Sequence, residues 1–201
     1  MGPPQSAFKV VASAGKKDGF EKPGLLVDLW QRGSIAKALK MGESTAVITR
    51  LKEHPEQLPS AIALLGKTDF TKRDKARKLF MKIVREESDQ VFLKKVLVAL
   101  GHGASKEYNE YANNQCGEIL TVAISRQELR GDALTAFADA LTSGNAKSMR
   151  VVLRELSAIV RHVISVPDGL REEVSRLTQG HDTYLKRMAE TVLEGMPPKT
   201  V

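Results

Sequence analysis

Apolar residues recur at intervals of three and four from Pro23 to about residue 195, and this spacing constrains the fold more than any other feature of the chain. Such spacing gathers apolar side chains on one face of an α-helix, whereas no segment alternates apolar and polar residues as a half-buried strand does. Aromatic residues are only 5% of the chain and hydrophobic residues are 42%, so Leu, Val, Ile and Ala must build the core. We therefore expect an all-α fold, a compact array of about nine to eleven short helices in hairpins.

Gly, Pro, Ser and Asp interrupt the apolar pattern at intervals that suit short connections between helices. The expected helices run approximately over 24–31, 34–41, 44–54, 56–66, 71–87, 89–100, 105–124, 127–142, 145–164, 168–179 and 182–195. Residues 1–22 mix Gly, Pro, Ser and Lys, which indicates a flexible N-terminal arm. We expect one helical domain over residues 23–196, followed by a C-terminal tail over 197–201.

Several expected helix ends carry residues that satisfy free backbone groups. Two pairs have the three-residue spacing of a capping box: Thr71 with Asp74, and Ser125 with Glu128. Two further residues are expected to be simple N-caps: Asn145 and Asp182. Four glycines directly follow apolar segments and are expected to end helices in the left-handed conformation: Gly42, Gly66, Gly101 and Gly144.

An Ala-Leu pair comes shortly before each of these glycines: Ala38-Leu39, Ala63-Leu64, Ala99-Leu100 and Ala140-Leu141. Residues 35–53 also align without gaps with residues 137–155, and the matches include the two corner glycines. Stacked hairpins of this kind resemble the HEAT and armadillo repeats, whose units are about 40 residues long. The resemblance is architectural, covers roughly residues 24–195, and implies an α-solenoid-like array. An irregular helical bundle explains the same corners, because the spacing between them is uneven and the Pro-Asp and Arg pattern of HEAT units is missing.

The chain is basic, with 31 Lys and Arg against 24 Asp and Glu and a net charge of +7, which favours an acidic partner. Two expected helices carry cations on the side away from their apolar face. The first basic stripe consists of Lys75, Lys78, Lys82 and Arg85, and the second of Lys147, Arg150, Arg154 and Arg161. A continuous basic surface would attract the phosphates of a nucleic acid. Solvated outer faces that keep a helical protein soluble are the more common role of such stripes.

Three aromatic residues are candidates for contact with a protein partner. Trp30 follows an apolar run next to the N-terminal arm, where it would pack the first hairpin or dock on another chain. Tyr108 and Tyr111 are close together and would anchor a partner or stack on bases, although half-buried helix residues are common at such spacing.

No pattern of residues predicts catalysis, a metal site or a cofactor site. The four histidines are scattered, without the i, i+4 pair that places two ligands on one helical face. The single cysteine, Cys116, cannot form an internal disulfide and has the position of a small buried hydrophobic residue. Arg130, beside Gly131, would suit a regulator of a small GTPase if it protruded as an arginine finger. An enzyme site assembled from residues distant in sequence stays open as an alternative.

The function that these features favour is a non-catalytic protein-protein interaction module of the adaptor, regulator or host-directed effector type, with an acidic partner. The alternatives are a nucleic-acid-binding protein that uses the two basic stripes, and the small-GTPase regulator or other enzyme. No apolar run reaches the length of about 18 residues that a membrane span needs. We expect a reducing, cytoplasmic location, with export by a route that cleaves no signal peptide as the alternative. The oligomeric state is left open.

Overall fold

The computed structural model of the chain describes residues 35–39, 41–105 and 110–199. Every regular element within these ranges is an α-helix or a 3-10 turn, and none is a strand, so the expected all-α fold is confirmed. The expected arm over 1–22, the expected helix over 24–31, Trp30 and Tyr108 all lie outside the described residues.

The helices follow one another with short connections. After a helical stretch over 35–39, the elements are α2 (Ser44–Glu53), η1 (Pro55–Gln57), α3 (Leu58–Ile62), η2 (Ala63–Gly66), α4 (Phe70–Glu86), α5 (Gln90–Ser105), α6 (Glu110–Ile124), α7 (Arg130–Ser143), α8 (Ala146–Ile159), η3 (Val160–His162), α9 (Asp168–Thr178) and α10 (Thr183–Gly195). The elements labelled η are 3-10 turns. None of the helices in the described ranges is both long and apolar enough to cross a membrane.

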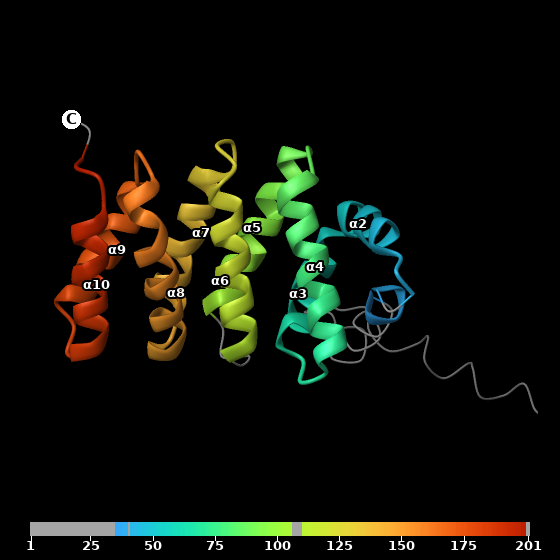
Figure 1. The fold of residues 1–201 in the computed structure, drawn as a ribbon, viewed down its shortest axis with the longest axis horizontal. Coiled ribbons are helices and arrows are strands. Elements are labelled where there is room, and N and C mark those ends of the chain that lie inside the picture. Colours follow the sequence, from blue (N-terminus) through green and yellow to red (C-terminus); the bar gives the residue numbers. More distant parts are fainter. Residues whose placement is uncertain (1–34, 40, 106–109, 200–201) are drawn as a thin grey trace, which may run out of the picture.

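From α3 onward, the helices lie in two layers (Figure 1). One layer holds α4, α6, α8 and α10, each in contact with the next, and we call it the even layer. The other holds α3, α5, α7 and α9, again each in contact with the next, and we call it the odd layer. Successive helices alternate between the layers, so the helices of one layer all run in the same direction (Figure 1).

The core fills the space between the layers and is largely aliphatic. Among the described residues, the largest fully buried side chains include two aromatic ones, Phe80 of α4 and Phe137 of α7. The other large residues in this set are Leu and Ile, among them Leu93, Leu97 and Leu100 of α5. The apolar faces predicted from the spacing are thus the faces by which the two layers pack together.

The expected simple caps are confirmed, whereas the expected capping boxes are wrong. The Asn145 side chain accepts hydrogen bonds from two backbone N–H groups at the start of α8, and Asp182 does the same at the start of α10. Helix α4 begins one residue before Thr71, and its cap is Asp69, which accepts from the backbone N–H of Lys72 at 3.2 Å. Helix α7 begins five residues after Ser125, with no side-chain cap. Ser125 lies instead in the connection between α6 and α7.

Only one of the four expected glycine corners has the left-handed conformation. Gly42 has φ +83°, but Gly144 is extended with φ −81° and ψ 160°, and Gly66 is the last residue of η2. Gly101 lies inside α5, where a Cβ would stand 2.8 Å from the Ala136 carbonyl oxygen. This glycine therefore permits close packing of α5 on α7 and does not end a helix. The aligned corners at Gly42 and Gly144 therefore differ in conformation and do not support an internal repeat. The repeat stays a prediction.

The expected C-terminal tail contacts the start of α9 as far as the structure describes it. The Lys199 ammonium lies 3.0 Å from the Asp168 carboxylate, and the Arg171 guanidinium donates to the carbonyl oxygen of Pro197. These contacts join residues 197–199 to the helical array.

Candidate functional site

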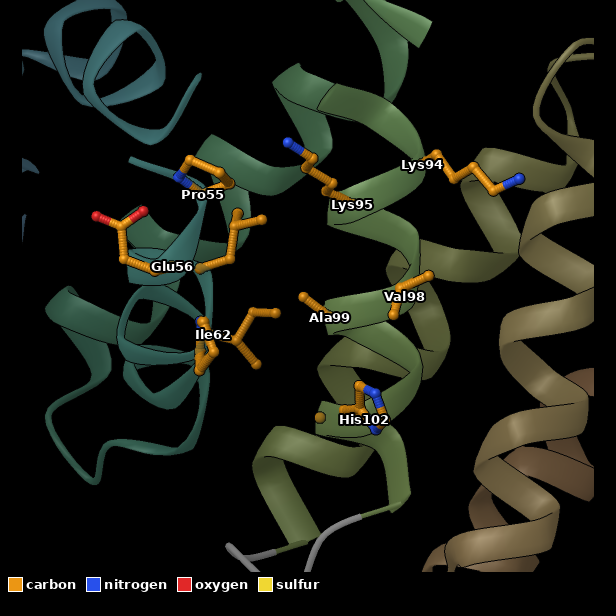
Figure 2. Close-up of a pocket in the computed structure, with 11 residues that line it drawn as sticks. Pro55, Glu56, Ile62, Lys94, Lys95, Val98, Ala99 and His102 are labelled. Atoms are coloured by element: carbon orange, nitrogen blue, oxygen red, sulfur yellow. The ribbon is translucent and has the colours of Figure 1, made fainter. Parts of the chain in front are cut away.

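A groove on the odd layer lies between α3 and α5, beside the contact that joins them (Figure 2). Helix α3 has five residues and α5 has 16, and at 1.5 Å per residue they span about 8 and 24 Å. The short helix therefore covers only part of the long one. The groove left between them encloses about 530 Å³, which falls within the range of binding pockets, about 300–1,000 Å³.

The walls of this α3–α5 groove are mainly apolar. Leu58 and Ile62 of α3 are buried beneath it, and Val98 and Ala99 of α5 face it from the other side. Val98 is 44% exposed, although it belongs to a helix whose other large apolar side chains are mostly in the core. The groove therefore offers a solvent-accessible apolar surface in which further apolar side chains can be buried.

Charged and titratable side chains stand around this apolar surface. Both Lys94 and Lys95 line the groove. Lys95 projects on the side of α5 that faces α3, whereas the Lys94 ammonium lies 3.8 Å from the carboxylate of Asp132 in α7 (Figure 2). Lys95 forms no ion pair with any residue in the described ranges. His102 lies further along α5, and Glu56 lies on the α3 side, 3.1 Å from His54. Lys95 is thus the cation at the groove that has the greatest freedom to pair with a bound group.

The floor of the groove is closed by a contact between three helices. A Cβ on Gly103 of α5 would stand 2.7 Å from the Cys116 sulfur of α6 and 2.7 Å from Ile62 of α3. Cys116 is fully buried as expected, and this burial raises the pKa of its thiol. The thiol therefore stays protonated at neutral pH and belongs to the packing of the floor.

The first basic stripe follows the outer side of α4. Lys78, Lys82 and Arg85 are exposed, Lys75 is half-buried, and the Lys78 ammonium lies 2.7 Å from the Asp74 carboxylate one turn earlier. The sequence therefore predicted correctly which side of this helix faces water.

The second basic stripe divides into two parts. Lys147, Arg150 and Arg154 line a cleft of about 870 Å³ between α6, α8 and α10, together with Glu110, Tyr184 and other residues. Arg161 lies beyond the end of α8, in η3, and does not line this cleft. Three of the four expected cations thus come together at one place, which we call the basic cleft.

Among the residues that the structure describes, the two basic stripes do not form a continuous cationic surface. Both α4 and α8 belong to the even layer, with α6 between them (Figure 1). Residues 110–124, which form α6, contain no Lys or Arg. They contain Glu110 and Glu118, and Glu118 pairs with Arg77 of α4. The described part of the even layer therefore carries two separate cationic patches, with a neutral to acidic helix between them.

Contacts between arginine and aromatic rings were not foreseen from the sequence. The Arg73 guanidinium lies 4.4 Å from the ring centre of Tyr111 and 5.6 Å from that of Phe70. The Arg150 guanidinium lies 5.0 Å from the ring centre of Tyr184. Tyr111 was a candidate contact residue, but Phe70, Arg73 and Tyr184 were missed. The sequence feature that could have identified these contacts is an aromatic residue at or next to the first position of three helices: Phe70, Tyr111 and Tyr184.

The arginine considered as a finger for a GTPase is held against the protein. Arg130 is half-buried, and its Nε donates a hydrogen bond to the carbonyl oxygen of Ile124 at 3.2 Å. This contact caps the C-terminal end of α6, which gives the residue a structural role. In the described ranges, no group of three or more His, Cys, Asp or Glu residues is arranged to hold a metal ion.

No protein-family model matches this chain, and a search of curated proteins finds no match.

Proposed function

We propose that this chain is a non-catalytic protein-binding module of the adaptor, regulator or effector type, and that its α3–α5 groove receives apolar side chains from a helix of the partner. The observation that carries the proposal is an apolar, solvent-accessible groove between two helices of unequal length. An amphipathic helix binds such a groove through residues spaced at i, i+3, i+4 and i+7.

The shape of the groove favours a polypeptide over a small molecule. A small ligand usually has 70–90% of its surface buried in its pocket. Val98, Lys95 and His102 are exposed to solvent at the α3–α5 groove, so the groove lies along the surface. A partner helix would cover this length of α5 and bury Val98 in the process. An acidic residue on that helix, near Lys95, would complement the charge of the groove.

A nucleic-acid-binding function has less support. The affinity of proteins for nucleic acids depends on many contacts between cations and successive phosphates. The interruption of the cationic surface at α6 limits such contacts on the even layer.

The proposal is tested with a displayed library of amphipathic helical peptides, panned against the full chain. We expect enrichment of peptides with apolar residues at i, i+3, i+4 and i+7 and an acidic residue near one end. Val98→Asp should weaken the binding of a selected peptide about tenfold or more, because it places a charge in the apolar contact.

The matched control is Ile164→Asp, which also replaces an exposed apolar side chain by a carboxylate. Ile164 lies outside α3 and α5, is 84% exposed and does not line the groove. Equal effects of the two substitutions, or a library that yields no binding peptide, would contradict the proposal.

A further inference from the structure

The first turns of α4, α6, α8 and α10 lie along one edge of the even layer, at the bottom of Figure 1. We call this the amino-terminal edge. It lies on the layer opposite the α3–α5 groove, and it combines exposed aromatic rings, arginines and the basic cleft.

At one part of the amino-terminal edge, Arg73 is placed close to two aromatic rings. Phe70 is 68% exposed and Tyr111 is 53% exposed, and Arg73 lies within 5.6 Å of both ring centres. Arg73 also donates to the carbonyl oxygen of Lys67 at 3.0 Å, which fixes its position further. Exposed large aromatic side chains beside an arginine have the composition of the residues that dominate protein interfaces.

At another part of the amino-terminal edge, α10 holds Arg150 in place. Asp182 accepts a hydrogen bond from the guanidinium at 3.1 Å, and the same carboxylate caps α10. Tyr184, which is 58% exposed, supplies the ring beside this guanidinium. Because these contacts already restrict Arg150, a partner that binds it loses less side-chain entropy than it would with a free arginine.

The basic cleft next to Tyr184 favours an acidic ligand. Lys147, Arg150 and Arg154 line it, and Glu110 is the one carboxylate among the described residues of the lining. Lys147 forms no ion pair with a residue in the described ranges. Met188 and Tyr184 add apolar surface to the same cleft. A ligand with carboxylates and apolar groups would complement both parts of this lining.

The arrangement of charge along the amino-terminal edge favours a polypeptide over a nucleic acid. The Arg73 group and the basic cleft are separated by α6, which has no cation in residues 110–124. Within the basic cleft, Asp182 engages Arg150 and Glu155 engages Arg154, which leaves Lys147 as the lining cation with no ion pair to a described residue. A regular row of phosphates would pass the carboxylate of Glu110 at the start of α6, whereas a polypeptide can place its carboxylates only where the cations are.

We propose that the amino-terminal edge is a second protein-binding surface, which takes an acidic segment of a partner protein. Its carboxylates contact the basic cleft, and its apolar or aromatic residues contact Phe70, Tyr111 and Tyr184. This inference rests on the proposed protein-binding function and adds a surface that is separate from the α3–α5 groove.

The test pans a displayed library of short random peptides against the full chain. Selected peptides should be rich in Asp and Glu and should contain at least one aromatic or large aliphatic residue. Fluorescence anisotropy with a labelled selected peptide should show affinity about tenfold or more weaker for Arg150→Glu. Lys147→Glu and Tyr184→Ser should each weaken it as well. Lys147 and Tyr184 are both exposed, and Lys147 has no ion-pair partner among the described residues, so these two substitutions should leave the fold intact. The test therefore does not depend on whether Arg150→Glu folds.

The matched control is Arg85→Glu, which makes the same change of charge at an exposed position in the last turn of α4, away from the amino-terminal edge. It should change the affinity by less than about twofold. An equal effect of Arg85→Glu would overturn the inference, because the binding would then depend on net charge alone. Failure to enrich any acidic peptide would overturn it too, as would tighter binding of a poly-dT oligonucleotide that is lost in Arg150→Glu.

The tests distinguish a failure of the groove proposal from a failure of the second surface. Val98→Asp should leave the binding of the acidic peptides unchanged. If helical peptides bind the α3–α5 groove and no acidic peptide binds the edge, only the second surface is wrong. If neither library yields a peptide, the protein-binding function itself is wrong.

Discussion

The two sides of α5 are packed very differently. On the side of α7, a Cβ at Gly101 would stand 2.8 Å from the Ala136 carbonyl oxygen, so the two helices are in close contact. On the side of α3, the α3–α5 groove leaves Val98 44% exposed. Helix α7 has 14 residues and α3 has five. The comparison indicates that the length of the neighbouring helix decides whether a face of α5 is sealed or stays open for a partner.

The sequence explains why α3 is short. Pro55 begins η1, Pro59 lies in the first turn of α3, and η2 follows directly. Proline lacks the backbone N–H that a continuous helix needs in its interior. The segment over 55–66 is therefore divided into short pieces that bury Leu64 and Leu65 but leave α5 partly uncovered.

The largest expected difference is between two adjacent residues of α5. Leu97 is fully buried, so Leu97→Ala should lower the free energy of unfolding by about 3 kcal/mol through lost burial and a cavity. Val98→Ala should change it by less than about 0.5 kcal/mol, because the side chain faces the open groove. Urea denaturation of both variants measures the difference. Similar losses would mean that the groove is closed in solution.

The sealed side of α5 is tested by glycine substitution. Gly101→Ala should lower the free energy of unfolding by about 2 kcal/mol, because the new Cβ would collide with backbone atoms of α7. Gly131→Ala is the matched control, since no atom lies within 4 Å of its Cβ position in α7. It should raise the free energy of unfolding by up to about 1 kcal/mol, as expected for Gly to Ala in a helix. A stabilising effect of Gly101→Ala would show that α5 and α7 are not in close contact.

The rate at which a thiol reagent labels Cys116 tests whether the floor of the groove is closed. Because its sulfur is buried behind Gly103 and its thiol pKa is raised by burial, a thiol reagent should react only after the chain opens. The labelling rate in the folded protein should be at least about a thousandfold below the rate in urea. Rapid labelling of the folded protein would mean that the groove continues into the core.

The smallest expected effect concerns Asp182, on the even layer. Its pKa is lowered by the backbone N–H of Leu185 first and by Arg150 second. The ionised carboxylate thus stabilises the fold above the pKa of the unfolded chain, about 3.9, and this contribution is lost as the pH falls through the lower folded pKa. Arg150→Met should raise this pKa only partly toward its ordinary value, as measured by NMR titration of the Asp182 carboxyl. An unchanged pKa would show that Arg150 is not held by Asp182 in solution.

Most helices could be predicted from the sequence because the residues that determine them, the apolar spacing and the caps, lie within the helix or next to it. The expected helices over 168–179 and 182–195 match α9 and α10 within one residue at each end, and the caps at Asn145 and Asp182 are confirmed. The end expected at Gly101 is wrong because contact with α7, which is distant in sequence, decides the role of that glycine. The start expected at Ser125 is wrong because a connection lies between it and α7.

The candidate sites could be predicted only in part. Apolar spacing identified the exposed sides of α4 and α8, and hence Lys78, Lys82 and Arg154 as surface residues. The pairing of Arg150 with Tyr184 depends on which helices are neighbours, which the spacing does not indicate. The groove was missed for the same reason, because it arises from the different lengths of two helices that pack side by side.

The central claim is that the α3–α5 groove is the open side of α5 and binds a partner helix. It is tested most directly by placing a photo-crosslinking amino acid at position 98 or at position 164 of the full chain and adding a helical peptide selected by panning. The account predicts a crosslink to the peptide from position 98 and none from position 164, since Val98 lines the groove and Ile164 does not. Crosslinking from both positions, or from neither, would contradict it.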